Sequence, residues 1–292
     1  MMKKILITGA NSYIGMSFEK YIKDNYSNEI EVDTLDMLDQ NWINYDFSKY
    51  DSVFHVAGIA HSDNGKISNE KEKLYRSVNT DLTVKTAKIA KEAGVKQFIF
   101  MSSAIVYGES AKIGKNKIIT KDTIPSPANC YGDSKLQAEV GLNKLSSNTF
   151  KVCIVRPPMI YGPKSKGNYP LLAKFAKKTP IFPTLKNQRS MLYIGNLVEF
   201  IRLMIINQEE GIFFPQNKEY SNTSELVKMI GKENNKNIVL IKGFGWCLKI
   251  LSLFTGLVNK AFGNFTYKQS MSEYKTNYIL YSLEESIKQT VN

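Results

Sequence analysis

The sequence predicts an α/β fold, namely a Rossmann-like doubly wound parallel sheet followed by a smaller C-terminal lobe. Three observations carry this prediction. Short β-branched runs alternate with helical patterns of about ten or more residues through the first half of the chain, as in βαβ crossovers. A glycine-bearing turn joins the first strand to the first helix. After Gly162 the alternation ends, and prolines separate shorter elements.

The elements of the first half follow one another in chain order. Strands are expected at Lys4 to Thr8, Ile30 to Leu35, Ser52 to Ala57, Gln97 to Met101 and Lys151 to Val155, and helices at Ser17 to Asn25, Ser77 to Glu92 and Ser134 to Leu145. The last strand stops at Pro157-Pro158 because proline has no N–H for the ladder. Strands joined by such long crossovers form a parallel sheet that is covered on both faces.

Length and composition set the number of domains. The chain has 292 residues, of which 43% are hydrophobic and 23% charged, so it can bury a sizeable core. Domains average about 150 residues. We therefore expect two domains, 1–165 and 166–292, with parts near 189–205 packing back on the first.

Several classes of protein and site are excluded. No stretch reaches the about 18 to 20 apolar residues of a membrane-spanning helix. The apolar run from Ile5 is too short for a secretory signal, so we expect a cytoplasmic protein. The few cysteines and histidines supply neither a disulfide framework nor a metal site, and we expect no metal: Cys130, Cys153, Cys247, His55 and His61.

The net charge of +12 suggests an anionic partner, such as a nucleic acid, an anionic lipid or a phosphorylated ligand. The lysines are scattered and form no basic stripe with interleaved aromatic residues, so we expect no nucleic acid. A polyanionic small ligand fits this charge. The apolar stretch Trp246 to Phe262 has only Lys249 and Lys260 as charges, and we favour a buried helix of the second lobe over docking on a membrane.

The turn from Gly9 to Gly15 follows a strand and opens a helix, which is where backbone N–H groups receive a pyrophosphate. An acidic residue that binds ribose is expected about 20 residues beyond the glycines. Asp33 and Asp36 both qualify, and we prefer Asp36 because it lies at the tip of the second strand. A carboxylate there repels a 2′-phosphate and favours NAD, with NADP as the alternative.

A tyrosine and a lysine lie four residues apart at the start of a helical pattern. This spacing places Tyr131 and Lys135 on one helix face. An ammonium that close is expected to lower the tyrosine pKa from about 10, so that Tyr131 exchanges a proton near neutral pH. Ser102 and Ser103 follow the fourth strand, where a hydroxyl can bind a substrate oxygen.

With these motifs the sequence resembles the extended short-chain dehydrogenase/reductases, in the NAD-dependent epimerase/dehydratase family of nucleotide-sugar enzymes. The resemblance covers nearly the whole chain and rests on seven motifs: Thr8-Gly9-x-x-Ser12-x-x-Gly15, His55-Val56-Ala57-Gly58, Asn79, Ser102-Ser103, Tyr131-x-x-x-Lys135, Arg156-Pro157-Pro158-x-x-Tyr161-Gly162-Pro163 and Arg189-Ser190-Met191-Leu192-Tyr193-Ile194. It implies an NAD(P)-binding first domain, a C-terminal substrate-binding lobe for a UDP-sugar, and a homodimer.

The resemblance also assigns roles to residues. Ser103, Tyr131 and Lys135 are the implied catalytic residues. Asn168 and Arg189 are the implied contacts to uridine diphosphate, and a planar guanidinium independently suits a diphosphate. The implied cofactor contacts, Asp46-Phe47 at the adenine end among them, are Gly9, Ser12, Tyr13, Ile14, Gly15, Asp36, Asp46, Phe47, Ala57, Gly58, Asn79, Tyr131, Lys135 and Pro158.

Departures from the family pattern narrow the reaction. Ser12 stands where the family usually has a glycine, Met159 where many 4-epimerases have asparagine, and Ser190 and Tyr193 replace an aspartate and a histidine. These changes argue against a galactose-type epimerase. The stretch from Arg156 more closely resembles a capsule and O-antigen subgroup that reduces UDP-4-keto-6-deoxy-N-acetylhexosamines to UDP-N-acetylfucosamine or UDP-N-acetylquinovosamine.

Three hypotheses follow for the function. The first is a 4-ketoreductase in which Tyr131 donates the proton, Ser103 binds the same oxygen and Lys135 holds the cofactor ribose. The second is a UDP-hexose or UDP-N-acetylhexosamine 4-epimerase with tightly bound NAD, which uses the same residues. The third is a non-catalytic nucleotide sensor, which has no need of all three side chains.

Overall fold

The structure is a computed structural model that describes residues 2–59, 68–244, 259 and 262–291. The chain forms two compact units. The first comprises Met1–Gly108, Pro125–Pro157 and Val198–Phe213, and the second comprises Glu109–Ile124, Pro158–Leu197 and Phe214–Asn292. Each unit is thus assembled from three separate stretches. The predicted domains are two consecutive pieces that meet after residue 165, with parts near 189–205 packing back on the first.

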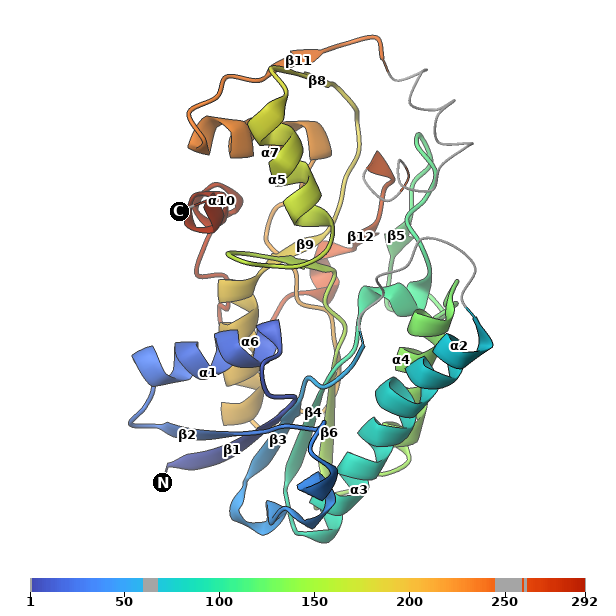
Figure 1. Cartoon of the computed structure of the whole chain (residues 1–292), viewed down its shortest axis with the longest axis vertical. Coiled ribbons are helices and arrows are strands. Elements are labelled where there is room, and N and C mark those ends of the chain that lie inside the picture. The colour runs from blue at the N-terminus through green and yellow to red at the C-terminus, as the bar shows by residue number, and fades with distance from the viewer. Residues whose placement is uncertain (1, 60–67, 245–258, 260–261, 292) are drawn as a thin grey trace. The chain divides into compact units, whose positions relative to one another are not determined.

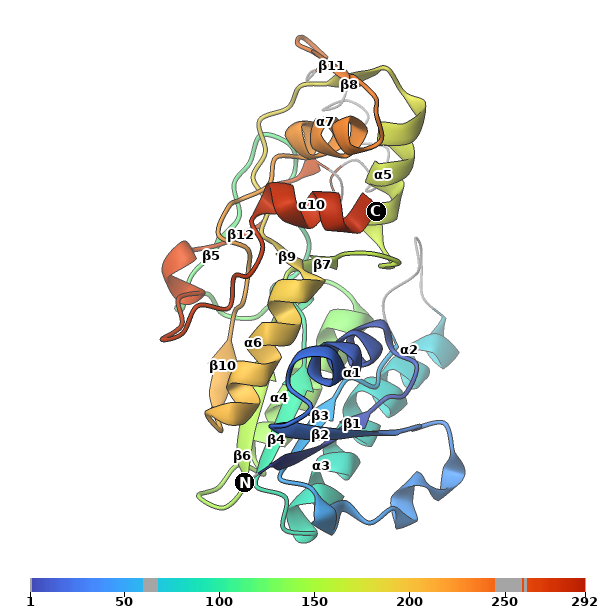
Figure 2. The ribbon, with the colours of Figure 1, turned by 90° about the vertical axis from the view of Figure 1, so that its left-hand side faces the viewer.

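The first unit is an α/β layer structure. Its elements are β1 (Lys3–Thr8), α1 (Tyr13–Asn25), β2 (Ile30–Leu35), η1 (Gln40–Asn44), η2 (Phe47–Lys49), β3 (Ser52–His55), α2 (Asn69–Tyr75), η3 (Arg76–Leu82), α3 (Thr83–Glu92), β4 (Gln97–Met101), η4 (Ala104–Tyr107), α4 (Cys130–Asn143), β6 (Lys151–Val155), α6 (Ile194–Ile206, from Val198 onward) and β10 (Gly211–Phe213). Helix α1 lies on one face of the sheet, and α3 and α4 lie on the other (Figures 1 and 2). The Rossmann-like fold class is confirmed.

The central sheet has six strands in the order β10-β6-β4-β3-β1-β2, and every pair is parallel. The strand order reverses between β1 and β3. In open α/β sheets a ligand binds at such a switch point, beyond the carboxyl ends of the strands. The turn after β1 and the loop after β3 both begin there, so the topology alone places the glycine turn in the binding position.

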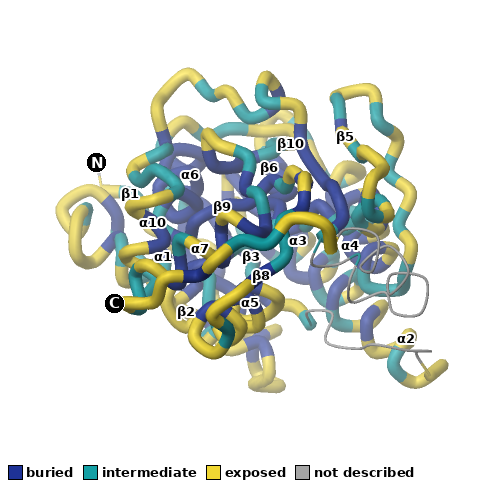
Figure 3. Tube along the Cα trace, turned by 90° about the horizontal axis from the view of Figure 1, so that it is seen from above, coloured by how far each residue is buried: buried dark blue, intermediate teal, exposed yellow. Residues whose placement is uncertain are grey.

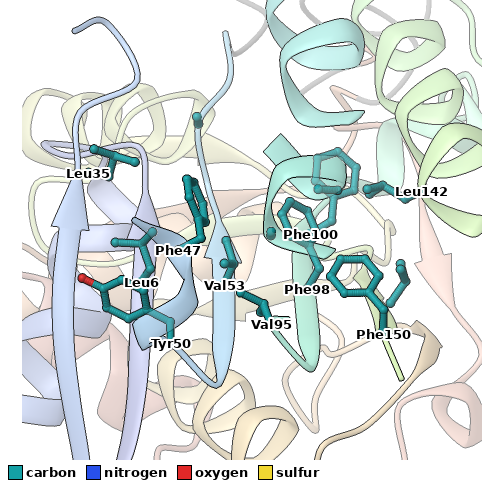
Figure 4. Packing of buried hydrophobic residues seen from close by; sticks show 14 of the residues in the cluster. Leu6, Leu35, Phe47, Tyr50, Val53, Val95, Phe98, Phe100, Leu142 and Phe150 are labelled. Atoms are coloured by element: carbon teal, nitrogen blue, oxygen red, sulfur yellow. The ribbon is translucent and has the colours of Figure 1, made fainter. Parts of the chain in front are cut away.

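Large apolar side chains fill the space between the sheet and its helices. Strand β4 is buried along its whole length, as expected for a parallel strand covered on both faces. Phe98 and Phe100 of β4 pack in one cluster with Phe150 and Leu142 (Figure 4). Phe47 of η2 belongs to the same cluster, which anchors the loop after β2 to the sheet.

Two helices begin four residues before their predicted starts, and a side-chain cap explains each. Ser12 caps α1, which begins at Tyr13 rather than Ser17. Asn129 caps α4, which begins at Cys130 rather than Ser134. Because the apolar periodicity of a helix is weak in its first turn, the capping residues mark these starts better than the pattern does.

The second unit is built from short elements. They are β5 (Ile118–Ile119), β7 (Met159–Tyr161), α5 (Asn168–Lys178), β8 (Ile181–Pro183), β9 (Met191–Tyr193), α7 (Thr223–Glu233), β11 (Val239–Ile241), β12 (Thr266–Tyr267), η5 (Gln269–Met271) and α10 (Leu283–Val291). Three two-stranded parallel sheets pair β8 with β11, β5 with β12, and β7 with β9. Helix α7 packs against both α5 and α10.

Two further findings bear on the predictions. Among the described residues, no helix is long and apolar enough to cross a membrane. Of the stretch Trp246 to Phe262, only Asn259 and Phe262 belong to the described residues, so the expected buried helix lies outside them, as do His61 and Cys247. Cys130 and Cys153 carry free thiols.

Candidate active site

The glycine turn brings the start of α1 against the loop after β3. Gly9 has a φ of +113°, and a Cβ built on it would lie 2.6 Å from the backbone nitrogen of Ala57. A Cβ on Gly15 would lie 2.6 Å from Ser12 Oγ and 3.1 Å from Ile7 Cγ2. Gly9 therefore permits the turn and the approach of two backbones, whereas Gly15 lets the helix sit close to the sheet.

Ser12 has a structural reason to depart from the family's glycine. Its Oγ accepts a hydrogen bond from Gly15 N at 3.1 Å and so caps α1. Tyr13 and Ile14 form the first turn of this helix, whose N-terminus carries a partial positive charge. An anion such as a pyrophosphate fits a backbone cradle of this kind.

Asn79 ties the loop after β3 to helix α4. Its Oδ1 accepts from Ile59 N at 2.8 Å, and its Nδ2 donates to Ile59 O and to Ser134 Oγ at 3.1 Å each. Asn79 is fully buried in the π-helical turn η3, a type of turn that often marks a functional site. Asn79 thus holds the backbone of Ile59, directly after Gly58, against α4.

Gly58 has no room for a side chain. A Cβ there would lie 3.0 Å from Asn79 Oδ1 and 3.3 Å from Lys135 Nζ. The backbone of Gly58 therefore passes directly beside the Lys135 ammonium, on the same side of the sheet as the glycine turn.

The predicted acidic residues and Phe47 follow β2. Asp36 comes directly after this strand, is exposed, and accepts a hydrogen bond from Leu38 N at 2.9 Å. The alternative, Asp33, accepts from the Tyr50 hydroxyl at 2.8 Å. Asp46 caps η2 through Ser48 N, which lowers the pKa of its carboxyl, and Phe47 places its side chain in the core. Their contacts to a cofactor stay predictions.

The three predicted catalytic side chains meet in the first unit. Ser103 follows β4 and caps η4, while Tyr131 and Lys135 lie one turn apart on α4. Tyr131 and Ser103 form a hydrogen bond. The carboxyl end of β4 and the start of α4 thus bring a serine hydroxyl and a phenol hydroxyl together, beside the lysine.

The expectation that Lys135 lowers the pKa of Tyr131 is wrong for this structure. Burial raises the pKa of Tyr131 to about 12, and only the hydrogen bond with Ser103 acts in the lowering direction. Desolvation disfavours the phenolate more than the nearby hydroxyl stabilises it. Tyr131 is therefore protonated at neutral pH.

Lys135 is buried and held in place by its surroundings. Its Nζ donates to Met101 O at 2.9 Å and lies 4.6 Å from the centre of the Phe100 ring. Burial lowers the pKa of Lys135 to about 8, and the charge of Glu139 counteracts this shift. The side chain thus remains mostly an ammonium at neutral pH.

A buried ion pair that sequence reasoning missed fixes the ends of β4 and β6. The carboxylate of Glu139, one turn after Lys135, accepts from Arg156 Nε at 3.0 Å and from Ser102 Oγ. Arg156 Nη1 also donates to the Tyr107 hydroxyl at 2.6 Å. The signal in the sequence was a glutamate four residues after Lys135, together with an arginine at the end of a strand.

His55 is not an acid or base at neutral pH. Its ring nitrogens lie 2.7 Å from Thr8 Oγ1 and 3.0 Å from Thr83 Oγ1, and the side chain is fully buried. Burial lowers the pKa of His55 to about 3, with the nearby Lys135 charge acting in the same direction. The His55 side chain therefore links β1, β3 and α3 through its contacts with Thr8 and Thr83.

The substrate residues predicted from the resemblance lie in the second unit. Asn168 is exposed and is the first residue of α5, which begins three residues earlier than expected. Arg189 Nη1 donates to Gly263 O at 2.9 Å, and burial lowers the pKa of its guanidinium to about 10. In the part of the chain that the structure describes, Arg189 forms no ion pair with a carboxylate. Pro158, which was predicted to contact the cofactor, is buried and directly precedes β7.

Two of the departures from the epimerase pattern are structural in the second unit. Ser190 Oγ donates to Gln216 and accepts from Tyr267 N at 2.8 Å. Tyr193 is buried, and its ring lies edge-on to Tyr281 with centroids 5.3 Å apart. These contacts pack the unit internally and explain why neither position needs an aspartate or a histidine.

Comparison with known proteins decides the family. Residues 5–214 match the NAD dependent epimerase/dehydratase family. The chain belongs to this family. It is 31% identical over 276 residues to a UDP-glucose 4-epimerase of Vibrio cholerae, with 88% of this chain and 83% of that protein covered. It is 30% identical over 283 residues to the N-acetyl-alpha-D-glucosaminyl-diphospho-ditrans,octacis-undecaprenol 4-epimerase of Escherichia coli O157:H7, with 88% and 82% covered.

Solved structures agree on the fold. A dTDP-4-dehydrorhamnose reductase of Clostridium acetobutylicum has a TM-score of 0.73 at 19% identity, covering 99% of this chain and 98% of that chain. A UDP-glucuronic acid 4-epimerase of Bacillus cereus in complex with NAD has a TM-score of 0.72 at 19% identity, with 99% and 95% covered. The protein is an enzyme of an NAD(P)-dependent family. The glycine turn, which opens helix α1 at the switch point of the sheet, fits such a dinucleotide.

Proposed function

We propose that the protein is an NAD(P)H-dependent 4-ketoreductase of a UDP-4-keto-6-deoxy-N-acetylhexosamine, which makes UDP-N-acetylfucosamine or UDP-N-acetylquinovosamine for surface polysaccharide. The observation that carries this proposal is the protonated Tyr131 hydroxyl beside Ser103. Burial raises the pKa of Tyr131 to about 12, so the side chain is poised as a proton donor at neutral pH. Reduction of a ketone needs such a donor at the oxygen.

Each side chain has one task in this proposal. Bound nicotinamide supplies the hydride that reduces C4 of the sugar. Tyr131 donates its proton to the C4 oxygen, and Ser103 donates a hydrogen bond to the same oxygen. Lys135 holds the cofactor ribose through its ammonium, which the Met101 carbonyl and the Phe100 ring keep in position. Asn79 keeps the loop of Ala57 and Gly58 against this group.

In the second unit we assign Arg189 to the diphosphate and Asn168 to the uridine part of the substrate. A half-buried guanidinium that forms no ion pair with a carboxylate among the described residues is suited to an incoming dianion. Its remaining N–H groups can bind two phosphate oxygens at once. A homodimer stays a prediction.

The second candidate function is a 4-epimerase, and the two relatives named 4-epimerases favour it. In that reaction Tyr131 first removes the proton of the C4 hydroxyl and later returns it, so the two functions use the same side chains. The names of these relatives include two carriers of the sugar, UDP and an undecaprenol diphosphate. Both carriers present a diphosphate, so Arg189 fits either one.

One experiment separates the two functions. Purified protein is mixed with UDP-4-keto-6-deoxy-N-acetylglucosamine and NADH or NADPH, and loss of nicotinamide absorbance is followed together with the sugar product by NMR. The reductase oxidises one cofactor for each new 6-deoxy sugar. If no cofactor is oxidised and UDP-N-acetylglucosamine is converted to its C4 epimer in a parallel sample, the protein is an epimerase rather than a reductase.

A further inference from the structure

Helix α5 of the second unit presents apolar and basic side chains to solvent on one side. Its buried residues, Tyr169, Leu172 and Ala176, fall on the opposite side. Leu171 and Phe175 are 53% and 54% exposed, although both are large apolar residues. The solvent side of α5 is formed by residues spaced as on one helix face, namely Leu171, Lys174, Phe175 and Lys178.

The sheet that follows α5 extends this exposed surface. Ile181 and Val239 are direct partners in the β8–β11 pairing, so both side chains point to the same side of the sheet. They are 53% and 55% exposed, whereas the next residue, Phe182, is buried. Lys236 Nζ donates to Lys177 O, which ties the segment before β11 to the end of α5. Figure 3 shows exposed residues, in yellow, along α5 and β8.

Lysines outnumber carboxylates in this region. Helix α7, which packs against α5, contributes Glu225 and Glu233 but also Lys228 and Lys232. From Val140 to Val198 the sequence contains no aspartate or glutamate, and the same holds from Asn234 to Phe244. The lysines of α5 and of the β11 segment therefore have no carboxylate of their own segments to neutralise them. An anionic surface complements this charge, whereas a neutral apolar partner does not.

We propose that the face formed by Leu171, Lys174, Phe175, Lys178, Ile181 and Val239, the α5–β11 face, docks on an anionic lipid bilayer. Its apolar side chains enter the headgroup region while the lysines contact lipid phosphates, as in interfacial amphipathic helices. The described helices do not span a bilayer, so the attachment is peripheral and reversible. If the proposed function holds, docking would keep the enzyme close to a membrane where its nucleotide-sugar product is used.

The test uses the purified full-length chain and vesicles, without any catalytic readout. Co-sedimentation is measured with vesicles of equal parts phosphatidylglycerol and phosphatidylcholine, and with phosphatidylcholine alone. We expect binding to the anionic vesicles, little binding to the neutral ones, and a loss of binding as salt rises from about 0.1 to 0.5 M, because screening shortens the range of the lysine charges.

Paired variants assign the binding to the face. Leu171→Ser with Phe175→Ser is expected to weaken binding about tenfold or more. Lys174→Glu with Lys178→Glu is expected to weaken it by at least about 25-fold, since each lysine near an anionic surface contributes about fivefold. The controls are Ile124→Ser, an exposed apolar residue outside the face, and Lys85→Glu with Lys88→Glu, which changes the net charge equally.

Three results would overturn the proposal. If the wild-type protein does not co-sediment with anionic vesicles, the docking proposal is wrong. Equal loss of binding in the two charge variants shows that net charge rather than this face is responsible. A wild-type dimer by light scattering that becomes a monomer in the Leu171→Ser, Phe175→Ser variant makes the face an interface between copies. Unchanged circular dichroism and melting temperature confirm that the variants are folded.

Discussion

At the scale of single residues, the decisive group is the Tyr131 hydroxyl. Tyr131→Phe keeps the ring and removes the proton donor, so turnover is expected to fall by about 10²–10⁴-fold or more. Binding of the reduced cofactor, measured by its fluorescence, should change little because Lys135 and the glycine turn remain. Tyr220→Phe is the matched control, since that hydroxyl donates to the Tyr267 carbonyl in the second unit. Unchanged turnover in Tyr131→Phe would remove this residue from the mechanism.

Burial of His55 makes the stability of the protein fall at acidic pH. Its pKa is about 3 when folded, against an ordinary value of 6.5. Above pH 6.5 the ring is neutral in both states and contributes nothing to the pH dependence. Below pH 6.5 only the unfolded chain takes up the proton, so stability is lost as the pH falls toward 3, by about 2 kcal/mol at pH 5.

The measurement is urea unfolding of wild type and His55→Asn at pH 8 and pH 5. We expect the variant to be less stable at pH 8, because it loses a ring between Thr8 and Thr83, but to lose less stability between the two pH values. Carboxylates titrate equally in both proteins and cancel in the comparison. Parallel pH profiles for the two proteins would contradict a neutral buried imidazole.

The sequence predicted which site residues come together better than it predicted their protonation. The spacing of Tyr131 and Lys135 placed both on α4, and the strand before Ser103 placed that hydroxyl beside them. The pKa of Tyr131 could not be predicted in this way, because burial depends on residues distant in sequence. The Arg156–Glu139 pair was missed for the same reason, since 17 residues and a strand separate the two.

At the scale of elements, the cap of α1 explains a residue that departs from the family pattern. Ser12→Ala removes the acceptor for Gly15 N and is expected to cost about 1 kcal/mol of stability, whereas Ser12→Gly costs a few tenths. Denaturation midpoints of the two variants measure this difference. A loss with glycine as large as that with alanine would mean that Ser12 acts by something other than capping.

Strands were predicted more closely than helices, and the reason is local. β2, β4 and β6 have the predicted bounds. β4 and β6 are apolar runs, whereas in β2 apolar residues alternate with Glu31 and Asp33. The helical pattern Ser77 to Glu92 instead contains the π-helical turn η3 before α3, which periodicity does not distinguish from a continuous helix. Strand β10 was not predicted, because its three residues are a strand only through pairing with β6.

At the scale of the whole molecule, the parallel sheet follows from the alternation of elements, but the makeup of the units does not. Val198–Phe213 belongs to the first unit, on which parts near 189–205 were expected to pack, and Glu109–Ile124 belongs to the second unit although it lies before the predicted border. No composition change marks these crossings in the sequence. Tertiary pairing, such as β10 with β6 and β5 with β12, decides them.

The cofactor links the site to the stability of the molecule. A ligand that binds only the folded protein stabilises it by about 2.7 kcal/mol at 100 times its dissociation constant. We therefore expect NADH to raise the melting temperature by about 5 °C or more. Asp36 lies exposed at the tip of β2, where a carboxylate repels a 2′-phosphate, so NADPH should give a smaller shift at equal concentration.

The variant Asp36→Asn tests this assignment directly, because it removes the charge and keeps the shape. We expect the NADPH shift to increase toward the NADH shift in this variant, while Asp33→Asn, the alternative acid, leaves the difference as in wild type. Asp33 is already engaged by the Tyr50 hydroxyl at 2.8 Å, which leaves Asp36 as the carboxylate available to a ribose. A larger shift with NADPH than with NADH in wild type would show that Asp36 does not select the cofactor.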